Sequence, residues 1–129
     1  MGGNLTGNGR FVYQIYYDLK SRESLDPGFI PLDNLSNPRP DWYEFWPIRN
    51  FLKHNALQEN AWYGFLSPKF GQKSGFDSEA VLGLLEQHHE SGDVALFSIR
   101  PDQLAYFLNP FEQGDVWYPG IQEASQDFL

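Results

Sequence analysis

The chain has 129 residues, enough for one domain with a hydrophobic core and too few for two full domains. Its 17 acidic residues outnumber 9 basic ones, giving a net charge of −8, so we expect no face that binds nucleic acid or anionic membranes. Because the chain has no cysteine, disulfides, thiolate nucleophiles and cysteine-ligated metal sites are excluded. Aromatic residues make up 17%, an excess that has to be buried or has to bind something.

The sequence predicts one folded domain. Residues 1–10 are rich in Gly and Asn and read as a flexible leader without the apolar core of a signal peptide. We expect residues 11–120 to form a single α/β domain and residues 121–129 to form an irregular tail. No apolar run approaches the roughly 20 residues of a membrane span, so the expected location is cytoplasmic.

The first predicted strand covers residues 11–17, a short run of β-branched and aromatic residues. Asp18 follows it, at the end of a strand where open α/β sheets bind ligands, although an Asp there can also simply start a turn. Residues 19–40 contain several prolines and no periodicity. We expect them to form an ordered loop over the sheet edge, which holds the polar side chains of Asp33, Asn34 and Asn37.

An aromatic stretch at residues 37–52 opens with two prolines. Asp41 and Glu44 have the spacing of a helix capping box. Pro47 requires either that the helix begin near Trp46, with the proline in its first turn, or that the helix kink there. Four side chains share one helix face: Trp42, Phe45, Trp46 and Arg49. This face either packs against a sheet or forms the wall of a pocket that stacks a flat or sugar-like ligand.

The remaining chain alternates strands and helices. The helix should end near residues 54–55, followed by a strand at 61–66 that is buried on both faces, with Gly64 marking the close approach of another backbone. A glycine-bounded loop at 71–75 precedes a helix at 79–89, which Asp77 or Ser78 caps. We expect a third strand at 93–99, a helix at about 102–113, and irregular structure from 114 onward.

This order predicts an α/β fold. Alternating strands and helices indicate parallel strands joined by right-handed crossovers. The expected architecture is a three-layer, Rossmann-like domain, with a mostly parallel sheet of three or four strands and helices on both faces.

Known catalytic motifs are missing from the sequence. There is no G-x-S-x-G elbow, no P-loop and no G-x-G-x-x-G after a strand, and no set of metal ligands is predicted. The basic side chains near predicted strand ends could hold a diphosphate through charge-assisted hydrogen bonds, or could be solvated surface charges: Arg39, Arg49, Lys69 and Lys73.

Four stretches carry a family resemblance: residues 37–49 (NPRPDWYEFWPIR), 62–70 (WYGFLSPKF), 93–98 (DVALFS) and 109–114 (NPFEQG). They resemble the N-terminal part of a group of little-characterised bacterial proteins grouped with glycosyltransferases. More distantly, they resemble capsule and polysaccharide glycosyltransferases of the GT-A type. In those enzymes a Tyr-Gly strand end precedes a basic pair. Here Tyr63-Gly64-Phe65 matches the strand and residues 67–70 (SPKF) replace the pair.

The resemblance implies a Rossmann-like, nucleotide-sugar-binding domain of surface-polysaccharide synthesis, with the acceptor half beyond residue 129. GT-A enzymes usually carry an Asp-x-Asp metal motif, which this chain lacks. The resemblance therefore implies either a fragment of a longer protein or a short relative that binds without catalysing transfer. No cofactor is expected within the chain, and a divalent metal such as manganese would belong to a longer functional enzyme.

The same reading assigns roles to individual residues. The nucleotide base or ribose faces Asp18 and the 33–39 loop, which includes Asp33, Asn37 and Arg39. Phosphate contacts Arg49, Lys69 and Lys73, and Trp42 or Trp46 flanks the pocket.

Two other functions fit the composition. The chain could be a non-catalytic interaction module, whose exposed aromatic residues dock a partner or a second copy of itself. It could also be a carbohydrate-binding domain with Trp42, Trp46 or Trp117 as stacking platforms. That function needs exposed rings.

Overall fold

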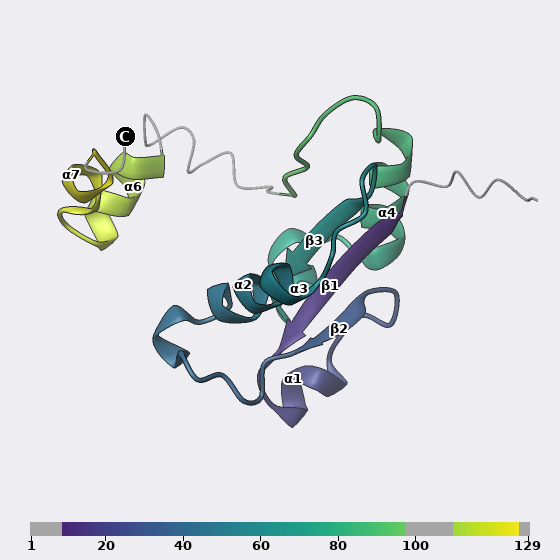
Figure 1. Cartoon of the computed structure of the whole chain (residues 1–129), viewed down its shortest axis with the longest axis horizontal. Coiled ribbons are helices and arrows are strands. Elements are labelled where there is room, and N and C mark those ends of the chain that lie inside the picture. The colour runs from purple at the N-terminus through teal and green to yellow at the C-terminus, as the bar shows by residue number, and fades with distance from the viewer. Residues whose placement is uncertain (1–8, 98–109, 127–129) are drawn as a thin grey trace, which may run out of the picture. The chain divides into compact units, whose positions relative to one another are not determined.

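A computed structural model describes residues 9–97 and 110–126. The chain divides into two compact units, residues 1–96 and residues 97–129. The first unit contains a β-sheet with helices, and the described part of the second contains two helices (Figure 1).

The sheet is built around its first strand. β1 (Arg10–Tyr16) lies between β2 (Ile30–Asp33) and β3 (Trp62–Leu66), and both neighbours run parallel to it. Tyr13 is paired with Ile30 on one side and with Phe65 on the other. The predicted strands at 11–17 and 61–66 and the predicted parallel sheet are thus confirmed, in a mixed α/β architecture.

One face of the sheet is covered by aromatic packing. Side chains alternate along a strand, so Phe11 and Tyr13 share a face with Tyr63 and Phe65 in the paired strand. Helix α2 (Phe45–His54) lies on this face through Phe51, whose ring centroid is 4.6 Å from that of Tyr13 and 5.4 Å from that of Phe65.

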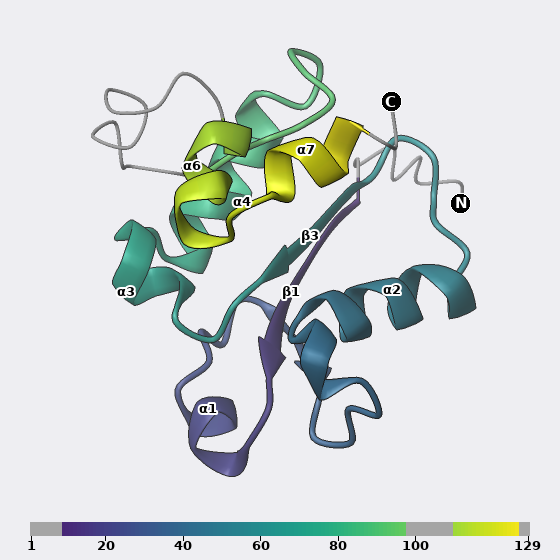
Figure 2. The same cartoon turned by 90° about the vertical axis from the view of Figure 1, so that its left-hand side faces the viewer.

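The opposite face holds most of the buried core. Val12 and Tyr16 of β1 are buried there, and so are Val81 and Leu85 of α4 (Ser78–Gln87). Figure 2 shows α2 and α4 on opposite sides of the sheet. Gly64 was expected to allow the approach of a backbone. Instead a Cβ at Gly64 would lie 3.3 Å from a methyl group of Val12, so the glycine makes room for a side chain.

A buried amide joins the loops at the ends of these elements. The Nε2 of Gln14 donates hydrogen bonds to the carbonyl oxygens of Ser67 (3.2 Å) and Pro68 (3.4 Å), and its Oε1 accepts one from the backbone N–H of Asp26 (2.9 Å). The Asp26 carboxylate in turn accepts hydrogen bonds from the backbone N–H and the hydroxyl of Ser78, at the start of α4. Hydrogen bonds from Ser78 hold the pKa of Asp26 below its ordinary value.

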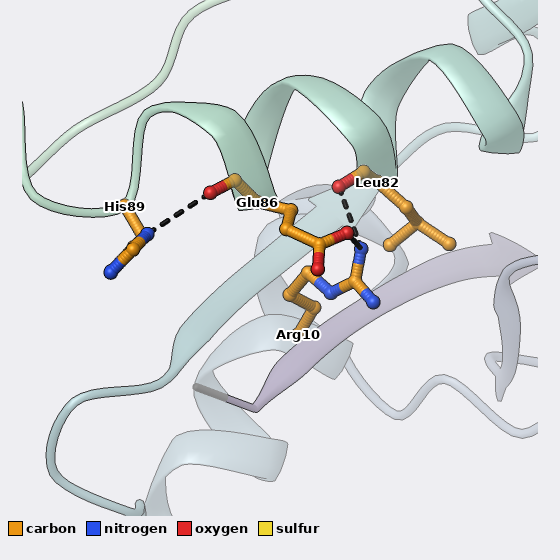
Figure 3. A network of polar contacts seen from close by, with 4 residues as sticks. All are labelled: Arg10, Leu82, Glu86 and His89. Carbon is orange, nitrogen blue, oxygen red and sulfur yellow. Dashed lines mark hydrogen bonds and ion pairs between the residues drawn. The ribbon is translucent and has the colours of Figure 1, made fainter. Parts of the chain in front are cut away.

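The other end of α4 is bound to the start of β1. Figure 3 shows the guanidinium of Arg10 donating to the carbonyl oxygen of Leu82 (2.8 Å) and to the carboxylate of Glu86 (3.2 Å). The Nδ1 of His89 lies 3.0 Å from the carbonyl oxygen of Glu86. These contacts hold α4 along the sheet at its C-terminal end.

The predicted loop at 19–40 is wrong in part, because it contains a helix and a strand. Asp18 begins α1 (Leu19–Glu23) as the N-cap of a capping box with Ser21. β2 follows, with Pro31 in an edge strand, where a missing N–H is tolerated. Both elements are too short to show periodicity in the sequence.

The predicted capping box at Asp41 and Glu44 is also wrong. Residues Pro40–Trp42 form a 3₁₀ turn (η1), and α2 starts at Phe45 without a side-chain cap. Asp41 instead accepts two hydrogen bonds from the guanidinium of Arg39. Pro47 does lie in the first turn of α2 and the helix ends at His54, as predicted.

Further differences concern β3 and the residues after it. All five residues of β3 are half-buried, so the strand is not buried on both faces. The expected loop at 71–75 is a short helix, α3 (Phe70–Ser74), closed by Gly75 at φ 77°. The predicted N-cap of α4 at Asp77 is confirmed, since its carboxylate accepts a hydrogen bond from the N–H of Ala80.

The predicted strand at 93–99 is wrong over residues 93–97, and its last two residues lie outside the described chain. Val94 and Leu96 are 75% and 87% exposed. The position of α4 explains this difference. α4 covers the same face as α1, whose Arg22 lies over the Tyr16 ring. Right-handed crossovers whose helices cover the same face of a sheet all place the next strand on the same side of the previous one. After β3, a crossover through α4 would therefore place the next strand where β1 lies, and β1 is already paired on both sides.

The second unit also corrects a prediction. α6 (Pro110–Trp117) contains the end of the helix expected at 102–113, while residues 102–109 lie outside the described chain. The expected irregular tail contains α7 (Ile121–Gln126), which follows Gly120 at φ 94°. In the described ranges no helix is long and apolar enough to cross a membrane.

We predict that Gln14→Met lowers the free energy of unfolding by about 1–3 kcal/mol, because it leaves two carbonyl oxygens and one N–H without their partner. Chemical denaturation measures the difference. Gln87→Met, at an exposed position of α4, is the control and should change stability by no more than about 0.5 kcal/mol. Equal effects of the two substitutions would contradict a special role for the buried amide.

Candidate functional site

The carboxyl ends of the three parallel strands lie at one edge of the sheet. β1 is followed by Asp18, β2 ends at Asp33, and β3 is followed by Ser67. The order β2-β1-β3 means that the chain leaves β1 toward one side and later returns to its other side. In open α/β sheets ligands bind beside such a reversal, at the carboxyl ends of the strands.

Asp33 belongs to a groove beside the edge strand. The Oδ1 of Asp33 accepts a hydrogen bond from the N–H of Leu35 (2.7 Å), and the N–H of Asn34 bonds to the carbonyl oxygen of Tyr16 in β1. The groove has a volume of about 300 Å³ and runs along α2. Its polar and aromatic lining includes Asp33, Asn34, Ser36, Trp46, Asn50 and His54.

The turn before α2 is held by the side chain of Asn37. Its Oδ1 accepts from the N–H of Arg39 (2.7 Å), and its Nδ2 donates to the carbonyl oxygen of Tyr43 (3.1 Å). Tyr43 has φ 48° and ψ −126°, a backbone conformation that residues other than glycine rarely adopt. Asn37 is therefore a residue that positions the turn rather than a free ligand contact.

Two arginines and two tryptophans form a cluster on this turn and the first half of α2. The Cζ of Arg39 lies 4.3 Å from the ring centroid of Trp42, and the Cζ of Arg49 lies 5.7 Å from Trp42 and 5.8 Å from Trp46. The two tryptophan centroids are 6.0 Å apart. Guanidinium groups at these distances are attracted to the faces of the rings.

The two arginines differ in their charge balance. Arg39 is bound to Asp41 through two hydrogen bonds of 3.0 and 2.7 Å, and this pairing holds the pKa of Asp41 below its ordinary value. Arg49 is half-buried, and among residues 9–97 no carboxylate lies within ion-pair distance of it. Arg49 thus lies close to the rings of Trp42 and Trp46, with no acidic counter-charge among residues 9–97.

A half-buried carboxylate lies next to this cluster. Burial raises the pKa of Glu44, and the positive charge of Lys73 in α3 opposes that shift. Lys73 is therefore close enough to the turn before α2 to act on it electrostatically. Nothing in the sequence singled out Glu44 as a buried group, since its position in a capping-box pattern indicated a solvated role.

The structure brings together most of the predicted site residues. The Trp42 ring lies near Arg39, Arg49 and Trp46, Asn37 holds the turn before α2, and Asp33 shares a groove with Trp46. Glu44 lies in the turn before α2, and the positive charge of Lys73 in α3 opposes the rise of its pKa. Asp18 has local contacts: the N–H and hydroxyl of Ser21 hold its pKa below the ordinary value. Lys69 is exposed at the position before α3.

Two aromatic residues of the turn were missed as site candidates. Tyr43 is 79% exposed, and Phe45 is 62% exposed although its periodicity placed it on a shared helix face. Because α2 starts only at Phe45, the helical spacing does not extend back through the turn. The signal in the sequence that could have indicated them is the presence of an aromatic residue on each side of Glu44.

We predict that Lys73→Gln raises the pKa of the Glu44 carboxyl further, because it removes the charge that opposes burial. A pKa raised by folding favours the protonated acid, so its contribution to stability is greatest below the unfolded-state pKa and is lost as the pH rises through the folded-state pKa. Glu44→Gln should therefore unfold at a higher temperature than the parent at neutral pH, and the advantage should shrink in acid. Carboxyl NMR titration and thermal unfolding from pH 4 to 7 measure both effects. A Glu44 pKa unchanged by Lys73→Gln would contradict their coupling.

Comparison of the chain with protein-family models, with curated proteins and with solved structures found no match. The function therefore has to be inferred from the chemistry and geometry of this site.

Proposed function

We propose that the chain is a glycosyltransferase-like domain that binds a nucleotide-sugar and belongs to surface-polysaccharide synthesis. The observation that carries this proposal is the strand order β2-β1-β3, with an acid at the end of β2 in a groove that Trp46 also lines. Dinucleotide-binding α/β folds bind at such reversals and use an acid to hold the ribose hydroxyls. A Rossmann-like, three-layer architecture is part of the proposal, supported by α2 and α4 on opposite faces.

In this proposal each part of the ligand has its own partners. Asp33 accepts hydrogen bonds from the ribose, within the groove beside α2. Arg49 binds phosphate, because its charge has no carboxylate partner among residues 9–97, and Lys73 adds a second cation. Trp42 and Trp46 hold the Arg49 guanidinium in place and flank the pocket. Asp18 and Lys69 are the outer members of the site.

A divalent metal is not part of this proposed site. GT-A enzymes usually hold manganese with an Asp-x-Asp motif, and the described residues contain no group of three or more histidine or acidic side chains that could hold a metal ion. The residues present do not fit such an ion, so we assign nucleotide binding to arginine and lysine side chains. Transfer of the sugar would need a longer functional enzyme.

We predict that one nucleotide-sugar of a UDP, GDP and CMP panel gives saturation transfer with the purified chain. Arg49→Gln should weaken its binding by about tenfold, which corresponds to about 1.4 kcal/mol. Lys53→Gln, at the far end of the same helix, is the matched control and should leave the affinity unchanged. If a folded sample gives no saturation transfer with any nucleotide-sugar of the panel, the proposed function is contradicted. If Lys69→Ala leaves the affinity unchanged, Lys69 does not belong to the phosphate site, and the rest of the proposal is unaffected.

A second candidate function is a self-association module. The exposed apolar side chains of Val94 and Leu96 favour it, and so does the outer edge of β3, which has no partner strand in the described chain. Natural proteins usually cover or charge such an edge.

If self-association occurs through these residues, the parent chain should sediment as a dimer or larger species at micromolar concentration. Val94→Lys combined with Leu96→Lys should then convert it to the monomer, because charges on an apolar interface oppose its burial. Analytical ultracentrifugation distinguishes the species. A monomeric parent at all concentrations would rule out this candidate.

A further inference from the structure

The turn between η1 and α2 reverses the usual placement of polar and apolar side chains. Glu44 is half-buried at a cost that its raised pKa reflects, whereas the aromatic residues on either side of it point outward. Tyr43 is 79% exposed and Phe45 is 62% exposed. Single exposed aromatic residues are common, but a carboxylate turned inward between two rings turned outward is not a pattern that core packing produces.

Backbone strain maintains this arrangement. Tyr43 has φ 48°, and the rest of its turn holds it there: Asn37 donates to its carbonyl oxygen and its own N–H bonds to the carbonyl oxygen of Pro40 (3.1 Å). Residues in such conformations usually cost free energy and persist where the surroundings determine them. Here the result of the strain is an exposed ring that buries little of its own surface.

The charges around the turn differ between its two sides. Beside Tyr43, the guanidinium of Arg39 and the carboxylate of Asp41 neutralise each other in a bidentate pair. On the other side, Arg49 is a half-buried cation that has no carboxylate within ion-pair distance among residues 9–97. Trp42 joins the two sides, since its ring centroid lies 4.3 Å from the Cζ of Arg39 and 5.7 Å from the Cζ of Arg49. The ring of Phe45 lies 5.6 Å from that of Trp42. The turn thus offers an anion contact next to an uncharged aromatic surface.

We propose that Tyr43 and Phe45 form the platform on which the sugar ring of the nucleotide-sugar packs, beyond the phosphate bound by Arg49. This inference rests on the proposed function and extends it to the sugar end of the ligand. A pyranose has an apolar C–H face that packs on an open aromatic surface, and hydroxyl groups that the nearby Arg39 and Asp41 pair can bond.

The test compares two ligands on matched variants. The affinities of the nucleoside diphosphate and of its sugar derivative are measured by calorimetry for the parent, Tyr43→Gly, Tyr43→Phe and Asn60→Gly. Asn60 is the control because it is exposed and also has a positive φ, 59°. Tyr43→Gly removes the ring and relieves the strain, so a loss of folding cannot explain a loss of binding.

We expect the sugar derivative to bind the parent about tenfold more tightly than the diphosphate, and this ratio to fall toward one in Tyr43→Gly. The ratio should persist in Tyr43→Phe and Asn60→Gly, and the thermal midpoint of Tyr43→Gly should equal or exceed that of the parent. Equal weakening of both ligands in Tyr43→Gly would place the base or phosphate there and overturn the platform. An unchanged ratio would also overturn it. Failure of the parent to bind either ligand would overturn the nucleotide proposal and the platform with it.

Discussion

The buried side-chain amide of Gln14 is the interaction on which the arrangement of the first unit depends. It lies on the central strand, where an unpaired polar group would cost free energy, and its three hydrogen bonds reach two different loops. One loop leads into α3 and the other leads into β2. Through Asp26 the same network reaches the first residue of α4. A single side chain of β1 therefore positions the segments at both edges of the sheet.

The two faces of the sheet are stabilised in different ways. On one face, Phe51 packs among the rings of Tyr13, Tyr63 and Phe65, which absorbs part of the high aromatic content. On the other, aliphatic side chains of α4 meet Val12, where Gly64 leaves space for its methyl groups. Since α2 is held by Phe51 in its second half and by the buried Pro47 in its first turn, the exposed side chains of the preceding turn can carry other chemistry.

That turn concentrates the features that core packing does not explain. It contains a strained tyrosine and a half-buried carboxylate, and it adjoins Arg49 of α2, whose guanidinium lies near two tryptophan rings. Arg49 is half-buried, and among residues 9–97 no carboxylate lies within ion-pair distance of it. The turn also adjoins the groove at the end of β2 through Trp46. These observations make the groove between the end of β2 and α2 the place to look for ligand binding.

The sequence alone predicted β1 and β3, the end of α2, the N-cap of α4 and the parallel α/β class, because apolar patterning and capping are local signals. It also placed Trp46 and Arg49 on one helix face, whereas Trp42 reaches them from the 3₁₀ turn before α2, where that spacing does not apply. Only the tertiary structure decided that Asp41 binds Arg39 rather than capping α2, and that Asp18 caps α1. Tertiary packing likewise left residues 93–97 out of the sheet. Short-range propensity permits several partners, so the sequence did not choose between the local partners of Asp41 and Asp18. For residues 93–97 the outcome depends on the face of the sheet that α4 covers, because a right-handed crossover on that face leads from β3 to β1, which is already paired on both sides.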